Sequence, residues 1–171
     1  LIFNSEKNVY KELHNQIIRY FHFLYMKAEQ GLSKKEINAW FNFSEVPNNW
    51  LGYALVGNKG LALGHKYAKF LYENISFALN THGISQSQHI EKAMLLYDGS
   101  GKDKISDLTV NLIKGFLCEY TEQFAKEYIQ PQFIKLFPVD KAYFNYDTES
   151  FISKEFALPF VYDEKGIPEY V

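Results

Sequence analysis

The chain has 171 residues, a formal net charge of −2 and a hydrophobic share of 47%. These values predict a domain of ordinary globular composition and exclude a disordered chain. They also disfavour binding to nucleic acid through bulk positive charge, which needs a concentration of basic side chains. Of the 18 basic residues only Arg19 is an arginine, the residue best suited to bidentate contacts with phosphate.

Apolar residues recur at helical spacing through most of the first 130 residues and predict about five helices. The expected helices span residues 5–30, 33–41, 60–80, 86–97 and 105–129. Ser33 and Glu36 have the spacing of a capping box at the start of the second helix, and Gly31 is expected to end the first. In the last helix one apolar stripe is expected to face the core, formed by Leu108, Leu112, Phe116, Tyr120, Phe124 and Tyr128. Core packing on such stripes is the first explanation for an aromatic content of 18%.

The composition changes after residue 130, because four of the five prolines lie in residues 131–171 and helical periodicity ends there. Residues 142–146 and 156–162 have the pattern of strands. Residues 163–166 are expected to form a turn to a last strand over 167–171, with Gly166 at the position of positive φ. The predicted fold is therefore mainly α, with about five helices and a small C-terminal β-hairpin.

This pattern predicts a helical domain over residues 1–130 and a proline-containing β extension over residues 131–171. The chain lacks an initiator Met, and its last residues have the pattern of a strand cut short. We therefore expect a truncated part of a longer protein.

The single cysteine, Cys118, excludes a disulfide framework and a cage of thiolate metal ligands. It lies inside a helical pattern, so we expect a small buried side chain rather than a nucleophile. No apolar run approaches the ~18 residues of a transmembrane helix, which predicts no membrane partner. Without a signal-peptide pattern, the sequence predicts a cytoplasmic protein.

The segment from Asp98 to Asp107 is the densest group of chemically active residues in the chain. Its carboxylates could hold Mg²⁺ or another divalent cation, and its glycines let backbone amides approach a ligand. The metal ligands would be Asp98, Asp103 and Asp107. The phosphate-binding residues would be Gly99, Gly101, Lys104 and Asn111. The catalytic residues would be Asp103, Asp107 and Lys102.

The same segment has a simpler interpretation. It matches neither a P-loop nor an EF-hand, because Asp103 follows Lys102 and Thr109 takes the place of the terminal Glu. It could be a solvated turn in which Ser106 caps the next helix. A second glycine-rich turn, over residues 57–66, allows anion binding or close helix packing equally.

The loop and the following helix carry the pattern Gly99-x-Gly101-x-Asp103-x-Ile105-Ser106-Asp107-Leu108. This pattern resembles a segment of uncharacterised bacterial proteins found in mobile elements and phage-defence neighbourhoods, a group without a family name. The resemblance covers at most residues 98–125. It implies that the loop is functional, that the whole protein is longer and that its work is related to nucleic acids.

Two functions follow from these observations. The first is part of a metal-dependent, nuclease-like bacterial enzyme that acts on phosphodiesters. The second is a non-catalytic helical protein-interaction module of a larger intracellular protein. Its partner would be another protein or the remainder of its own chain, and the charge balance does not support nucleic acid.

Overall fold

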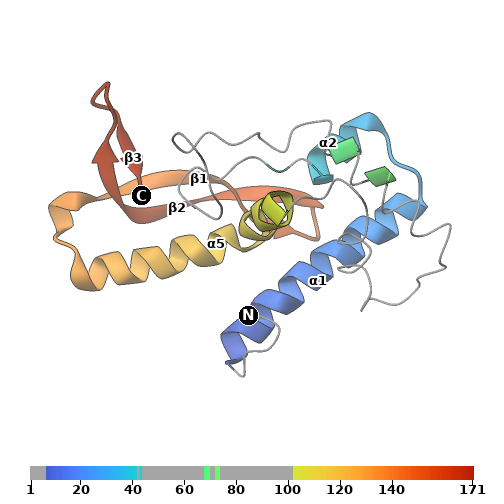
Figure 1. Ribbon diagram of the computed structural model, residues 1–171, viewed down its shortest axis with the longest axis horizontal. Helices are drawn as coiled ribbons and strands as arrows, with labels where there is room; N and C mark the ends of the chain where they lie inside the picture. The colour runs from blue at the N-terminus through green and yellow to red at the C-terminus, as the bar shows by residue number, and fades with distance from the viewer. Residues whose placement is uncertain (1–6, 42, 44–67, 70–71, 74–101) are drawn as a thin grey trace. The chain divides into compact units, whose positions relative to one another are not determined.

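The computed structural model describes residues 7–41, 43, 68–69, 72–73 and 102–171, with the backbone alone for 102–107 (Figure 1). The chain divides into two compact units, Leu1–Val110 and Asn111–Val171. The division falls inside the long helix α5, Lys102–Tyr128. Of the helix expected over residues 60–80, only 68–69 and 72–73 are described, and these are helical; residues 86–97 lie outside the described part.

The first unit contains α1 (Asn8–Glu29) and α2 (Lys34–Phe41). The buried side chains of α1 recur every three or four residues, as the sequence predicted: Leu13, Ile17, Tyr20, Phe21, Leu24, Tyr25 and Ala28. The helix is followed by Gly31 in a left-handed conformation with φ of 73°. The predicted end of the first helix is therefore confirmed.

A reciprocal pair of hydrogen bonds starts α2. The Ser33 N–H donates to Glu36 Oε2 at 2.8 Å, and the Glu36 N–H donates to Ser33 Oγ at 3.3 Å. This confirms the predicted capping box. Aromatic contacts fix α2 against α1, since the Trp40 ring packs edge-on against Phe23 at 5.2 Å and the Trp40 carbonyl accepts a hydrogen bond from Tyr20.

The second unit contains residues 111–128 of α5 and a three-stranded antiparallel sheet, and Figure 1 shows the helix alongside β1 and β2. A short 3-10 helix, η1 (Pro131–Phe133), leads into the sheet. Its strands, in the order β1-β2-β3, are β1 (Ile134–Asn145), β2 (Ser150–Tyr162) and β3 (Pro168–Tyr170).

The described residues thus form an α+β fold with three α-helices and a three-stranded sheet. The prediction of a mainly α fold, with about five helices and only a small hairpin, was wrong.

The prediction missed the first half of β1. Pro138 interrupts the strand pattern there, because proline cannot donate a hydrogen bond to a sheet ladder. It is tolerated because β1 lies at the edge of the described sheet. The turn after β1 was also missed. Asn145 forms it by accepting hydrogen bonds from the N–H groups of Asp147 and Thr148 at 2.8 and 3.1 Å.

The predicted hairpin between β2 and β3 is confirmed. Phe160 pairs with Tyr170, and Tyr162 pairs with Pro168. In the turn between them, Asp163 Oδ1 accepts hydrogen bonds from the backbone of Lys165 and Ile167. Gly166 has a φ of 74°, a conformation that glycine adopts without steric cost.

The helix packs on the sheet through its small residues. The core of the second unit consists of Cys118, Val139, Ala142, Phe156 and Leu158. A Cβ atom built on Gly115 would lie 2.2 Å from the ring of Tyr143 and 2.7 Å from the Ala142 carbonyl oxygen. The absence of a side chain at Gly115 therefore lets the helix approach β1 closely.

The opposite face of α5 carries large aromatic side chains that are exposed. Tyr120, Phe124 and Tyr128 have exposed fractions of 63%, 50% and 66%. The sequence assigned this stripe to the core, and for these three residues that prediction was wrong. The physical reason is that another face of α5 packs on the sheet, where Cys118 lies in one core cluster with Val139, Ala142, Phe156 and Leu158.

Candidate functional site

The residues predicted to bind metal and phosphate lie at the start of α5 and before it. Asp98, Gly99 and Gly101 are outside the described residues. Residues 102–107, which include the other predicted metal ligands, belong to the first two turns of α5. The helix begins at Lys102 and not at residue 105, because no helix-breaking residue follows Gly101. Ser106 therefore lies inside the helix and is not its N-cap.

Farther along α5, Asn111 is buried with an exposed fraction of 3%, whereas Lys114 is half-buried. Within the part of the chain that is described, no group of three His, Cys, Asp or Glu side chains could hold a metal ion. Metal and phosphate binding by residues 98–107 stays a prediction.

No described helix is long and apolar enough to cross a membrane.

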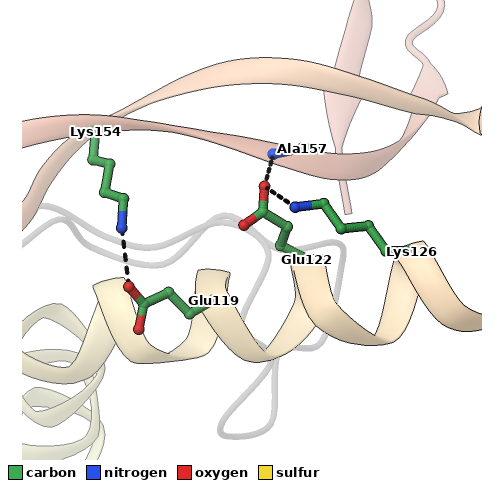
Figure 2. Close-up of polar contacts among 5 residues, drawn as sticks. All are labelled: Glu119, Glu122, Lys126, Lys154 and Ala157. Carbon is green, nitrogen blue, oxygen red and sulfur yellow. Dashed lines mark hydrogen bonds and ion pairs between the residues drawn. The ribbon is translucent and has the colours of Figure 1, made fainter.

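Polar contacts clamp α5 to β2 in the second unit (Figure 2). Glu119 Oε1 lies 3.0 Å from Lys154 Nζ, and Glu122 Oε1 accepts a hydrogen bond of 2.8 Å from the Ala157 N–H. Lys126 Nζ lies 3.2 Å from the same Glu122 oxygen. We call Glu119, Glu122, Lys154 and the Ala157 N–H the polar clamp. Because Glu122 accepts the hydrogen bond of the Ala157 N–H, this donor of β2 cannot pair with a further strand.

The clamp shifts the acidity of its members. The hydrogen bond from the Ala157 N–H, supported by Lys126, lowers the pKa of Glu122. The Tyr143 hydroxyl and the Lys154 ammonium lower the pKa of Glu119. Burial is the main cause that raises the pKa of Tyr143, and the neighbouring Glu119 carboxylate adds to it. These contacts favour the ionised form of both carboxylates, and they connect the helix to the sheet.

The substitution Glu122→Gln tests the polar clamp. We expect a loss of about 0.5–1.5 kcal/mol in the free energy of unfolding at pH 7, a hydrogen-bond contribution reduced by partial solvation. The pKa of Glu122 is lower in the folded chain, so its charge stabilises the fold above the unfolded pKa of ~4.3. That stabilisation is lost as the pH falls through the lower, folded pKa. Urea unfolding of both proteins between pH 3 and pH 7, the range set by ~4.3, measures it.

The exposed Glu155 of β2 provides the matched control. Glu155→Gln should change the free energy of unfolding by less than about 0.5 kcal/mol at every pH. A difference between wild type and Glu122→Gln that does not shrink with falling pH would contradict the charge-dependent contact.

The aromatic face, which we define as Tyr120, Phe124 and Tyr128, is an exposed apolar surface on the helix of the second unit. These residues follow one another at intervals of four, so they form a ridge along α5. The rings of Phe124 and Tyr128 lie 4.8 Å apart, and Tyr120 stacks with Phe116 at 6.5 Å.

The aromatic residues of α5 are recognisable in the sequence, but their predicted environment, the core, was wrong for Tyr120, Phe124 and Tyr128. Helical periodicity predicts that they share a face, and it does not say whether that face meets the core or solvent. The small residues Gly115, Cys118 and Ala125, at their own helical spacing, were the signal that another face packs more closely.

Comparison with known proteins identifies the family. No curated protein and no solved structure matches the chain. A family model described as a domain of unknown function, DUF8370, matches residues 1–167. This match covers nearly the whole chain, and the chain therefore belongs to the DUF8370 family.

Proposed function

We propose that this domain is a protein-interaction module and that the aromatic face of α5 is its binding surface. The observation that supports this function is the exposure of Tyr120, Phe124 and Tyr128, each half or more in solvent, on consecutive turns of one helix. Clustered exposed aromatic side chains on a soluble domain are typical of interaction sites. Tyr and Phe also supply large contact area at low cost in side-chain entropy.

The partner that fits this surface is a helix of another protein. A ridge at four-residue spacing packs into the groove between side chains of a second helix. The exposed Glu127 borders the ridge, whereas Glu119 is bound to Lys154 in the polar clamp. A partner helix with an apolar stripe bordered by Lys or Arg would pair with Glu127.

The edge strand β1 and the part of β2 beside α5 are less suited to a partner. Pro138 removes a donor from β1, and Glu122 occupies the Ala157 N–H of β2. Devices of this kind keep exposed strands from pairing with another chain. Because these strand positions cannot donate to another chain while the aromatic face of α5 is exposed, we place the binding surface on the helix.

Photo-crosslinking from one position tests the proposed function. The full chain with p-benzoylphenylalanine in place of Phe124, in the source cells, should give one discrete adduct with another protein. Tyr120→Ala with Tyr128→Ala should reduce that adduct at least about tenfold, because central aromatic residues contribute most of the energy of an interface. Circular dichroism of the variants checks that the fold is unchanged.

Phe133 is the matched control position. It is an aromatic residue with a similar exposed fraction, 54% against 50% for Phe124, and it lies in η1, outside α5. The photo-crosslinker at position 133 should give no adduct of that size. The proposal is wrong if position 124 gives no adduct, if both positions give the same adducts, or if the adduct has twice the mass of the chain.

A further inference from the structure

The sheet of the second unit has a second face, opposite the one that packs on α5. In β2, Phe156 and Leu158 lie in one core cluster with Cys118 of α5. Because side chains alternate between the two faces of a strand, the opposite face receives residues 155, 157, 159 and 161 of β2. We call this side of the sheet the outer face.

The outer face carries a patch of apolar side chains from β1 and β2. Strand pairing places Leu136 opposite Ala157, and it places Ile134 opposite Pro159, so these residues share the outer face. Leu136 and Val161 are exposed, with fractions of 60% and 52%. We define the outer patch as Ile134, Leu136, Ala157, Pro159 and Val161.

The composition of β2 is that of a strand covered on both faces. An antiparallel sheet with one face in water usually alternates apolar with polar residues along each strand. The run Phe156–Tyr162 instead contains no charged residue and no amide. Continuous apolar runs of this kind are typical of strands that are buried on both sides. The composition therefore indicates a binding surface on the outer face, since α5 packs on the other.

Acidic residues lie at both ends of the outer patch. At one end, Glu169 of β3 pairs with Val161. At the other end, Glu155 pairs with Pro138, one outer-face position beyond Ala157. Both glutamates are exposed, and neither forms an ion pair with a described residue. No basic residue occupies the outer-face positions between them, so the patch is apolar in its centre and negative at each end.

We propose that the outer patch binds an amphipathic helix of a partner protein, with Lys or Arg at each end of its apolar stripe. The helix would pack on this face as α5 packs on the other, and its cations would lie beside Glu155 and Glu169. At about 3.3 Å per strand residue, Glu155 and Val161 are about 20 Å apart along β2. A helix spans that distance in about 13 residues, at about 1.5 Å per residue.

A second copy of the chain fits the outer patch less well. Both ends of the patch are acidic, so either alignment of two outer faces would place carboxylates opposite carboxylates. Like charges in such positions disfavour association. The outer patch consists of strand residues only, so it is separate from the aromatic face and its existence does not depend on protein binding by that face.

A synthetic helix tests the outer patch. The probe is a peptide of about 14 residues that has a leucine face with lysine at both ends, and its control carries glutamate in place of lysine. The protein is the full chain with p-benzoylphenylalanine in place of Leu136. It also carries Tyr120→Ala and Tyr128→Ala, which weaken any binding at the aromatic face. Irradiation should link the lysine peptide at least about tenfold more than the glutamate peptide.

Charge reversal and a neighbouring position provide the controls. Glu155→Lys with Glu169→Lys should reverse the preference and favour the glutamate peptide, because the ends of the patch are then positive. Lys135 is exposed and directly precedes Leu136, and it lies on the other face of β1. The photo-crosslinker at position 135 should therefore give no peptide adduct. Circular dichroism checks that each variant is folded.

The comparison of the two peptides uses the unchanged glutamates, so it holds even if the charge-reversed protein fails to fold. The proposal is overturned if position 136 gives no peptide adduct, if both peptides link equally, or if position 136 links to a second copy or within the chain itself. It is also overturned if a folded charge-reversed protein keeps the original preference.

Discussion

Replacing Gly115 with alanine is expected to destabilise the second unit by about 1–3 kcal/mol, the typical cost of an overpacked core. The added methyl group would lie 2.2 Å from the Tyr143 ring and 2.7 Å from the Ala142 carbonyl oxygen. The ring could turn, whereas the carbonyl belongs to the backbone of β1 and could move only with the strand. The helix would have to withdraw from the sheet.

The sign of the change in the free energy of unfolding distinguishes overpacking from helix propensity. In an isolated helix the same substitution would stabilise by about 1 kcal/mol, because alanine is the better helix former. Urea unfolding of wild type and Gly115→Ala measures the outcome. Gln123→Ala, at an exposed position of α5, is the control and should lie within about 0.5 kcal/mol of wild type. A Gly115→Ala protein as stable as wild type would contradict the close approach of α5 to β1.

A double-mutant cycle identifies the atoms responsible. Tyr143→Leu removes the ring atoms that face Gly115, and it leaves the Ala142 carbonyl in place. In the Tyr143→Leu background Gly115→Ala should therefore cost less, though more than zero, with a coupling of at least about 0.5 kcal/mol.

Replacing Phe156 with alanine is expected to have the largest effect on stability, about 3–5 kcal/mol, because it would leave a cavity in the core of the second unit. Phe156 is fully buried, with an exposed fraction of 0%. It pairs with Phe137 across β1 and β2, and Lys154 Nζ lies 5.1 Å from its ring centroid. The change would thus also remove a cation–π contact beside the polar clamp.

The same substitution at Phe124 is the matched comparison. Phe124→Ala should change the free energy of unfolding by less than about 0.5 kcal/mol, since its side chain is half exposed on the aromatic face. Phe156→Leu, which fills much of the cavity, should cost less than about 1.5 kcal/mol. Chemical unfolding followed by circular dichroism measures all three. Equal losses at positions 124 and 156 would contradict the assigned environments of the two rings.

The aromatic residues of α5 show what hydrophobic periodicity predicts and what it leaves undetermined. Helical spacing predicted correctly that Phe116, Tyr120 and Phe124 share a face of α5. It could not predict what that face meets, because apolar residues gather both in cores and at binding surfaces. Gly115 and Cys118 determine which face of α5 packs against the sheet, because their small size lets the sheet approach on that side.

The polar contacts of the second unit, unlike the predicted cluster at residues 98–107, could not be predicted from the sequence. The predicted cluster at residues 98–107 came from residue types that are close in sequence. The polar clamp joins Glu119 and Glu122 to β2 residues 35 positions away. Contacts over such separations leave no local pattern, because they depend on how a helix is seated on a sheet.

The sequence by itself determined the elements whose causes are local. The bonds between Ser33 and Glu36, the left-handed Gly31 and the Asp163–Gly166 turn each depend on a few adjacent residues with fixed conformational preferences. Tertiary structure decided the length of β1, the face of α5 that the sheet buries and the exposure of its aromatic residues. The physical reason is that strand pairing and close packing are set by partners distant in the chain, which outweigh the preferences of any single segment.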